Sequence, residues 1–141
     1  MATINLDYFA GLFDGEGSVS INLRNDGFQT VAGRIAIAMT HPIVMELPTA
    51  FGCGSTHAQN RKTKSGLQVY IWSVQDRKEL LRFLPTLIPL LRVKKQQASL
   101  LFDFCSHLSI TDSGKGKKLS PEEKAYRKTF VQRCKELNGS L

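Results

Sequence analysis

The pattern of apolar and polar residues in the first part of the chain predicts one helix followed by two strands. An apolar run predicts a helix from about Asn5 to Asp14, because asparagine is a good N-cap and glycines follow the run. Strict alternation then predicts strands over 18–24 and 29–40, with a turn signal at 25–27 between them. These segments form the first predicted β-hairpin.

The rest of the pattern predicts a second hairpin set among helices. A short helix is expected to open at Pro42 and to stop by Gly52, since proline suits the first helical turn. Strands follow over 55–62 and 67–74, around a basic turn. Further helices are predicted over 76–84, 93–107 and 120–138, two of them opening with capping-box spacing and the first broken by Pro85 and Pro89.

Four strands with helices before, between and after them predict an α+β fold with one antiparallel sheet. In the first hairpin, the face expected under the helices carries Val19, Ile21, Leu23, Val31, Ile35, Ile37 and Met39. In the last strand we assign Gln68, Tyr70 and Trp72 to the polar face, and Val69, Ile71 and Val74 largely to the apolar one. Polar side chains on a two-stranded ribbon suit the major groove of DNA, although a solvated sheet face explains the same composition equally well.

Composition narrows the class of protein. The 141 residues, 42% hydrophobic and 22% charged, fit one folded domain, divided into a core over 1–110, a flexible basic loop over 111–120 and a C-terminal helix over 121–141. Nineteen Lys and Arg against twelve Asp and Glu give a net charge of +7, which favours nucleic acid or an anionic surface as partner. An acidic N-terminus and the lack of a long apolar stretch predict an intracellular protein without a signal peptide or membrane span.

Cysteine and histidine usage excludes several kinds of site. Cys53, Cys105 and Cys134 are odd in number and widely spaced, so we expect reduced thiols, with neither a disulfide framework nor a metal-ligand pattern. The three histidines have no zinc-type grouping, and no nucleotide-binding glycine loop is present. No small-molecule cofactor is therefore expected.

The segment 9–17, FAGLFDGEG, carries the most informative chemistry. It places Asp14 and Glu16 between glycines at the end of an apolar helix, where a bare buried charge is costly and the helix dipole disfavours an anion. Ala10 and Gly11 would let a second helix approach closely. The segment predicts a metal site at a helix–helix seam; the alternative is an ordinary amphipathic helix with a glycine cap.

The same segment, with the alternating strand after it, closely resembles the LAGLIDADG motif of the homing endonucleases. It keeps the A-G-L core, both acids and the final glycine, and its departures at Phe9, Phe13, Gly15 and Glu16 preserve size or charge. A second segment, 89–98, resembles the family segment that follows a proline into the long helix. The resemblance covers about residues 5–108, and the tail helix matches nothing specific.

The resemblance implies a fold and an assembly. The fold is an αββαββα core with a four-stranded, saddle-shaped antiparallel sheet, here with an extra C-terminal helix. Chains of this family with one motif pair as homodimers, and only one motif is present, so we expect a two-fold dimer on a long, nearly palindromic double-stranded DNA target. The expected interface residues are Phe9, Ala10, Gly11 and Leu12.

The resemblance also implies roles for individual residues. Glu16 aligns with the metal-binding acid, the Gly15 carbonyl with a backbone ligand, and Asp14 with a structural acid, so Mg²⁺ shared between two active sites is expected. Lys94 fills a lysine position beside the active site, or else contacts only the DNA backbone. His41 falls where some relatives keep a water-positioning residue, or else it caps the next helix; Met45 stands where a basic residue is expected.

Two sets of DNA contacts are expected. Base contacts are assigned to Ser20, Asn22, Arg24, Arg34, His57, Gln59, Arg61, Gln68, Tyr70 and Trp72. Phosphate contacts, which add affinity without sequence information, are assigned to Lys62, Lys64, Lys95, Lys115, Lys117 and Lys118.

These features predict a site-specific, Mg²⁺-dependent DNA endonuclease that makes a double-strand break, of the kind encoded by mobile introns. The alternative keeps the fold without cutting, as an intron maturase or a DNA-binding regulator. Glu16 and Lys94 favour cleavage, because a pure binder would need no metal-binding acid at the helix seam. A small-molecule enzyme has no supporting set of nucleophile and base.

Overall fold

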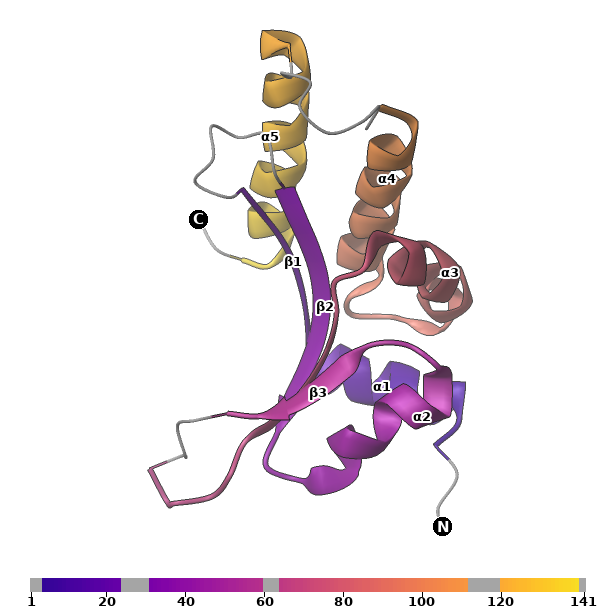
Figure 1. Ribbon diagram of the computed structural model, residues 1–141, viewed down its shortest axis with the longest axis vertical. Coiled ribbons are helices and arrows are strands. Elements are labelled where there is room, and N and C mark those ends of the chain that lie inside the picture. Colours follow the sequence, from indigo (N-terminus) through magenta and orange to yellow (C-terminus); the bar gives the residue numbers. More distant parts are fainter. Residues whose placement is uncertain (1–3, 24–30, 60–63, 112–119, 140–141) are drawn as a thin grey trace.

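The computed structural model describes residues 4–23, 31–59, 64–111 and 120–139. Within these ranges the elements follow an α+β order, as predicted (Figure 1). Their bounds are α1 Leu6–Glu16, β1 Gly17–Leu23, β2 Val31–Met39, the 3-10 helix η1 Pro42–Glu46, α2 Leu47–Phe51, β3 Ser55–Ala58, β4 Tyr70–Val74, α3 Arg77–Leu87, the 3-10 helix η2 Ile88–Leu90, α4 Lys95–Thr111 and α5 Pro121–Leu137.

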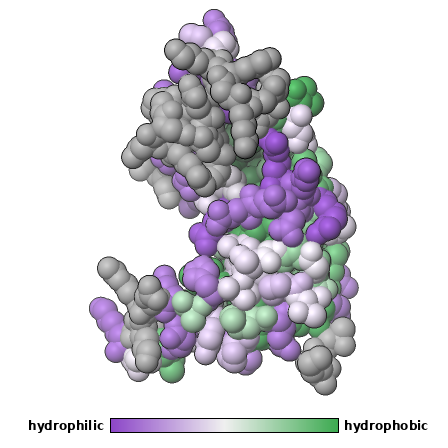
Figure 2. Space-filling model, in the orientation of Figure 1, coloured by the Kyte–Doolittle hydropathy of each residue, from purple (hydrophilic) through white to green (hydrophobic). Residues whose placement is uncertain are grey.

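The four strands form one antiparallel sheet in the order β1-β2-β4-β3. Ile35 pairs with both Val19 and Val74, and all three side chains are buried beneath the helices. The sheet curves with its hollow on the side away from α3 and α4, and Figure 2 shows the molecule indented there. The predicted fold class, an open four-stranded sheet with helices on one face, is confirmed.

Aromatic rings fill the core between α1, the sheet and α3. The Phe9 ring lies 5.3 Å from Trp72 and 5.7 Å from Phe83, and all three side chains are buried. The indole of Trp72 donates to the Cys53 carbonyl at 3.1 Å, which satisfies its one polar group. The assignment of Trp72 to the polar face is therefore wrong. Residues two apart in a strand share a face, so Trp72 lies with Val74, and the pairing of Tyr70 with Met39 puts Tyr70 there as well.

Predicted helix starts hold, whereas several ends differ. Asn5 caps α1, Asp76 caps α3 and Ser120 caps α5, each side chain accepting an amide three residues on. Helix α1 runs two residues past Asp14, so both acids of the motif are helical. Helix α3 continues through Pro85 to Leu87, because Leu84 and Leu87 are buried and their packing outweighs the lost hydrogen bond.

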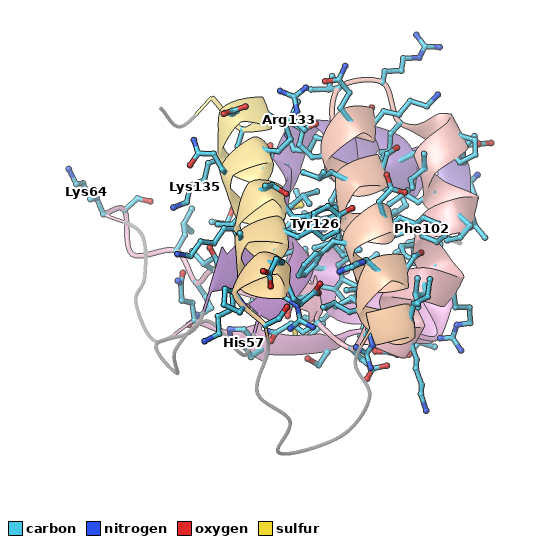
Figure 3. The ribbon with its side chains drawn as sticks, turned by 90° about the horizontal axis from the view of Figure 1, so that it is seen from above. His57, Lys64, Phe102, Tyr126, Arg133 and Lys135 are labelled. Atoms are coloured by element: carbon cyan, nitrogen blue, oxygen red, sulfur yellow. The ribbon has the colours of Figure 1, made fainter. Side chains whose placement is uncertain are left out.

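Helix α5 packs against β1 at the edge of the sheet. It lies beside α4, which in turn lies beside α3 (Figure 3). The Phe104 and Phe130 rings are 5.1 Å apart between α4 and α5. Asn138 donates to the Val19 carbonyl at 2.9 Å, and the Cys134 thiol approaches the same oxygen. These contacts cover backbone that an edge strand leaves open.

Two further observations concern the state of the cysteines and the apolarity of the helices. Cys53, Cys105 and Cys134 are free and buried, and burial raises the pKa of the Cys105 thiol to about 11. Among the helices within the described ranges, none combines the length and the apolarity needed to cross a bilayer.

Candidate active site and nucleic-acid interface

Asp14 joins the end of α1 to the start of α4. Its carboxylate accepts the backbone amides of Arg92 at 2.9 Å and of Val93 and Lys94 at 3.0 Å each. These amides precede α4, where helical N–H groups lack partners and the dipole attracts an anion. Asp14 thus binds the backbone in front of α4 through donors about eighty residues away in the sequence, and its assignment as the structural acid of the motif stays a prediction.

The charge of Asp14 is stabilised in this position. Partial burial opposes ionisation, but the three amide hydrogen bonds and the nearby Lys94 charge outweigh it and hold the pKa of the carboxyl below its usual 3.8. Asp14 is therefore anionic at neutral pH and fully engaged by donors. It is poorly placed to act as a proton donor or as an open metal ligand.

Lys94 lies beside the end of α1. Its Nζ is 3.3 Å from the Asp14 main-chain carbonyl, and its side chain is only partly exposed. Since the Lys94 amide also binds the Asp14 carboxylate, the residue is fixed at both ends. The structure therefore places a cation next to the last turn of the motif helix.

Glu16 is the last residue of α1 and is exposed. The preceding Gly15 lies in the final turn, where carbonyl oxygens have no donor further along the helix. Both groups offer oxygen, the ligand type that Mg²⁺ prefers with one or two carboxylates, water and phosphate. Over the described ranges, no cluster of three or more His, Cys, Asp or Glu side chains could hold a metal within one chain. The donors fit Mg²⁺ only if phosphate or a second copy completes the set.

His41 occupies the position of a helix cap. Its Nδ1 accepts the Ile43 amide at 3.0 Å at the start of η1, which is the structural role left open by the sequence. Met45, in the same 3-10 helix, is exposed and brings no charge. A catalytic role for His41 stays a prediction, and it can involve only the other ring nitrogen.

The outward face of α1 differs from the one predicted. Phe9 and Ala10 are buried in the core of their own chain, so they are unavailable to a second chain. Gly11 and Gly15, four residues apart, instead face outward, and a Cβ at either would meet no atom within 4 Å. Leu12 is partly exposed beside them. Residues 10 and 11 are both small but do not share a surface, because about 100° of helix turn separates them.

One face of the sheet is open to a ligand. Paired residues across an antiparallel sheet share a face, so Ser20 lies with Arg34, and Ser18, Ala36, Ser73 and Ser55 form one row across four strands. The next row is Ala38, Ile71 and His57. The side chains of this face from residues 18, 20, 22, 34, 38, 55, 57 and 71 are exposed or partly exposed. This surface is long, mostly polar and opposite the helices.

The structure places the predicted DNA contacts differently from one another. Ser20, Asn22, Arg34 and His57 lie on the open face, and Lys64 extends from the second hairpin, away from the helices (Figure 3). Gln68 is instead tied to its own hairpin, donating to the Gln59 carbonyl at 2.6 Å. Lys95 is exposed in the first turn of α4. Six positions lie outside the described residues: Arg24, Arg61, Lys62, Lys115, Lys117 and Lys118.

Among the exposed or partly exposed residues of the open face, four were assigned no DNA contact from the sequence: Ser18, Ser55, Ala38 and Ile71. The sequence does show that Ile71 and Trp72 cannot share a face, because adjacent residues of a strand point to opposite sides of the sheet. Arg34 carries a further clue to binding. The residue is partly exposed on the open face, while its Nε is buried and finds no hydrogen-bond partner among the described residues.

Several solved structures share this fold. The homing endonuclease I-CvuI in complex with the I-CreI target has a TM-score of 0.71 at 22% sequence identity, and the match covers 94% of this chain and 80% of that one. The archaeal intron-encoded homing endonuclease I-Vdi141I, complexed with DNA, has a TM-score of 0.61 at 17% identity, covering 93% and 96%.

The LAGLIDADG meganuclease I-AabMI bound to uncleaved DNA has a TM-score of 0.63 at 17% identity, covering 89% of this chain and 49% of that one. No protein-family model matches the sequence, and no curated protein matches it either. Likeness at such low identity establishes a common fold, and function has to be argued from the site.

Proposed function

We propose that this chain, which has the fold of the LAGLIDADG homing endonucleases, is a site-specific DNA endonuclease that acts as a homodimer. The observation that carries the proposal is the exposed Glu16 carboxylate at the end of α1, with Lys94 held beside that end by Asp14. The start of β1 follows directly, so the site lies at the end of the sheet where β1 begins.

The open face supports DNA as the ligand. Its hydroxyl, amide, imidazole and guanidinium groups supply both donors and acceptors, which base edges in the major groove require. The net charge of +7 favours a polyanion, and structures with this fold are DNA complexes. Arg34, a partly exposed guanidinium on this face, suits a guanine edge or a phosphate.

The outward face of α1 supports a second copy as partner. Gly11 and Gly15 leave the helix backbone bare over one turn, with Tyr8 on the same face and about half exposed. Small residues four apart allow two helices to approach closely. A two-fold pair of α1 helices would bring two Glu16 carboxylates together, and their repulsion would favour a bound cation.

Each residue then has a distinct task in phosphodiester hydrolysis. Glu16 and the Gly15 carbonyl would hold Mg²⁺, which when bound polarises the phosphate and makes water a better nucleophile. Lys94 places a positive charge where negative charge develops on the phosphate. Asp14 keeps Lys94 and the α1 end in register, and it takes no part in proton transfer because its carboxylate is already committed to three amides.

Selection of cleaved sites tests this function directly. The full-length protein is incubated with a randomised duplex DNA pool and Mg²⁺, and ligated ends are sequenced, with an EDTA reaction as the control. We expect one long, nearly palindromic site to be recovered only with Mg²⁺, since protein symmetry is mirrored in the target. Recovery of bound but never nicked DNA would contradict cleavage and favour the alternative, a binder such as an intron maturase or a regulator.

A further inference from the structure

Ile71 is an apolar residue on the sheet face opposite the core. It follows Tyr70 and precedes Trp72, both of which pack toward the helices, so its own side chain points to the open face. Ile71 is only partly buried, and it lies outside the hydrophobic cluster formed by the described residues. Its side chain therefore contributes little to the core of its own chain.

Across the neighbouring strands, Ile71 has one apolar and one polar partner. Ala38 pairs with it on one side and is exposed, while His57 pairs with it on the other. The remaining rows of the open face differ, since Ser20 stands beside Arg34, and Ser18 and Ser55 end the row next to Ile71. Ile71 and Ala38 thus form an apolar patch within a mostly polar surface.

An apolar position suits one base edge in the major groove better than the others. Adenine, guanine and cytosine present only hydrogen-bond donors and acceptors there, whereas thymine adds a 5-methyl group. A donor or acceptor pressed against isoleucine would lose its water without gaining a partner. A methyl group would gain apolar contact instead.

We propose that Ile71, with Ala38 beside it, forms a subsite that selects thymine through the 5-methyl group. The inference rests on the proposed DNA-binding function and adds a specificity that the function alone does not require. It assigns to Ile71 a positive preference for one base, and to Arg34 and Ser20 the hydrogen-bonded contacts at other positions.

The test compares two randomised duplex pools that differ in one methyl group. One pool is synthesised with thymidine and the other with deoxyuridine in its place, and both are bound to the full-length protein without divalent metal before sequencing. We expect one position in each half-site to prefer thymine over deoxyuridine about fourfold, the factor that corresponds to burial of one methyl-sized group. The other base preferences should be the same in both pools.

Two variants test whether Ile71 itself causes the thymine preference. The Ile71→Ala protein should lose the preference for thymine over deoxyuridine, while Ile110→Ala, a matched change at an exposed residue of α4, should keep it. Equal selection of both pools by the wild-type protein would overturn the inference while leaving DNA binding intact, as would a thymine preference that persists in Ile71→Ala. Failure to recover any duplex would instead overturn the proposed function, and the inference with it.

Discussion

Asp14 and Lys94 are joined twice across eighty residues of sequence. The Asp14 carboxylate accepts the Lys94 amide at 3.0 Å, and the Asp14 carbonyl lies 3.3 Å from the Lys94 Nζ. The pair fixes the end of α1 against the start of α4, and so sets where the Lys94 charge stands relative to Glu16. In this chain the predicted structural acid of the motif and the lysine proposed to act on the phosphate form one unit.

Removing the charge of Asp14 should destabilise the fold. In Asp14→Asn, one amide replaces a carboxylate that accepts three backbone donors, so we expect a loss of about 2 kcal/mol in the free energy of unfolding. Urea denaturation measures this. The control is Asp103→Asn, at an exposed residue of α4, which should change stability by less than about 0.5 kcal/mol. Equal effects of the two substitutions would contradict the capping role.

The contribution of Asp14 should also depend on pH. Because the folded pKa of Asp14 is below its ordinary 3.8, this stabilisation is present above that value and is lost as the pH falls through the folded pKa. The difference in unfolding free energy between wild type and Asp14→Asn should therefore be constant above about pH 5 and shrink toward about pH 3. A difference that grows on acidification would show that the carboxylate is not stabilised in the folded protein.

Glycines of the motif should separate into two kinds. A Cβ on Gly17 would overlap the Phe13 ring and lie 2.6 Å from the Phe13 carbonyl, so Gly17→Ala should lower the unfolding free energy by about 2 kcal/mol. At Gly11 an added Cβ would have open space around it, so Gly11→Leu should leave the monomer folded but weaken dimerisation at least about tenfold. Sedimentation equilibrium measures the latter, with Ala125→Leu on exposed α5 as the control. A monomeric wild type would contradict the proposed assembly.

Sequence pattern predicts this fold well where local signals are strong. The helix caps at Asn5, Asp76 and Ser120 and the two hairpins follow from residues close together in the chain. For β4, the prediction of which residues face the core was wrong, because this strand is apolar on both faces, with Trp72 inward and Ile71 outward. Composition alone does not show which of these two residues is buried in the core. In the structure it is Trp72, because its ring packs into the aromatic cluster around Phe9.

The sequence predicts which residues form the candidate site, but not which groups they contact. The motif indicates that Asp14 and Glu16 differ in role, but the donors of Asp14 belong to residues 92–94, whose approach depends on the packing of α4. The same limit applies to α1, where burial of Phe9 and Ala10 sets the rotation of the helix and hence the exposure of Gly11 and Gly15.

Two adjacent lysines should affect different steps. Lys94→Gln removes a charge held beside the motif helix and should slow cleavage by about 100-fold while changing DNA affinity little. Lys95→Gln, at an exposed neighbour, should weaken binding and reduce its salt dependence without changing the rate of bound complexes. Single-turnover cleavage and salt-dependent binding on the selected site measure both. Identical profiles for the two variants would leave Lys94 with a backbone-contact role only.

The role of Glu16 is tested most directly by Glu16→Gln on the selected DNA site with Mg²⁺. The substitution keeps size and hydrogen bonding but removes the anionic oxygen at the end of α1, so cleavage should be abolished while DNA affinity stays within about threefold of wild type. Glu122→Gln, at an exposed acid in α5, should cut normally. A Glu16→Gln protein that cleaves at the wild-type rate would contradict the account.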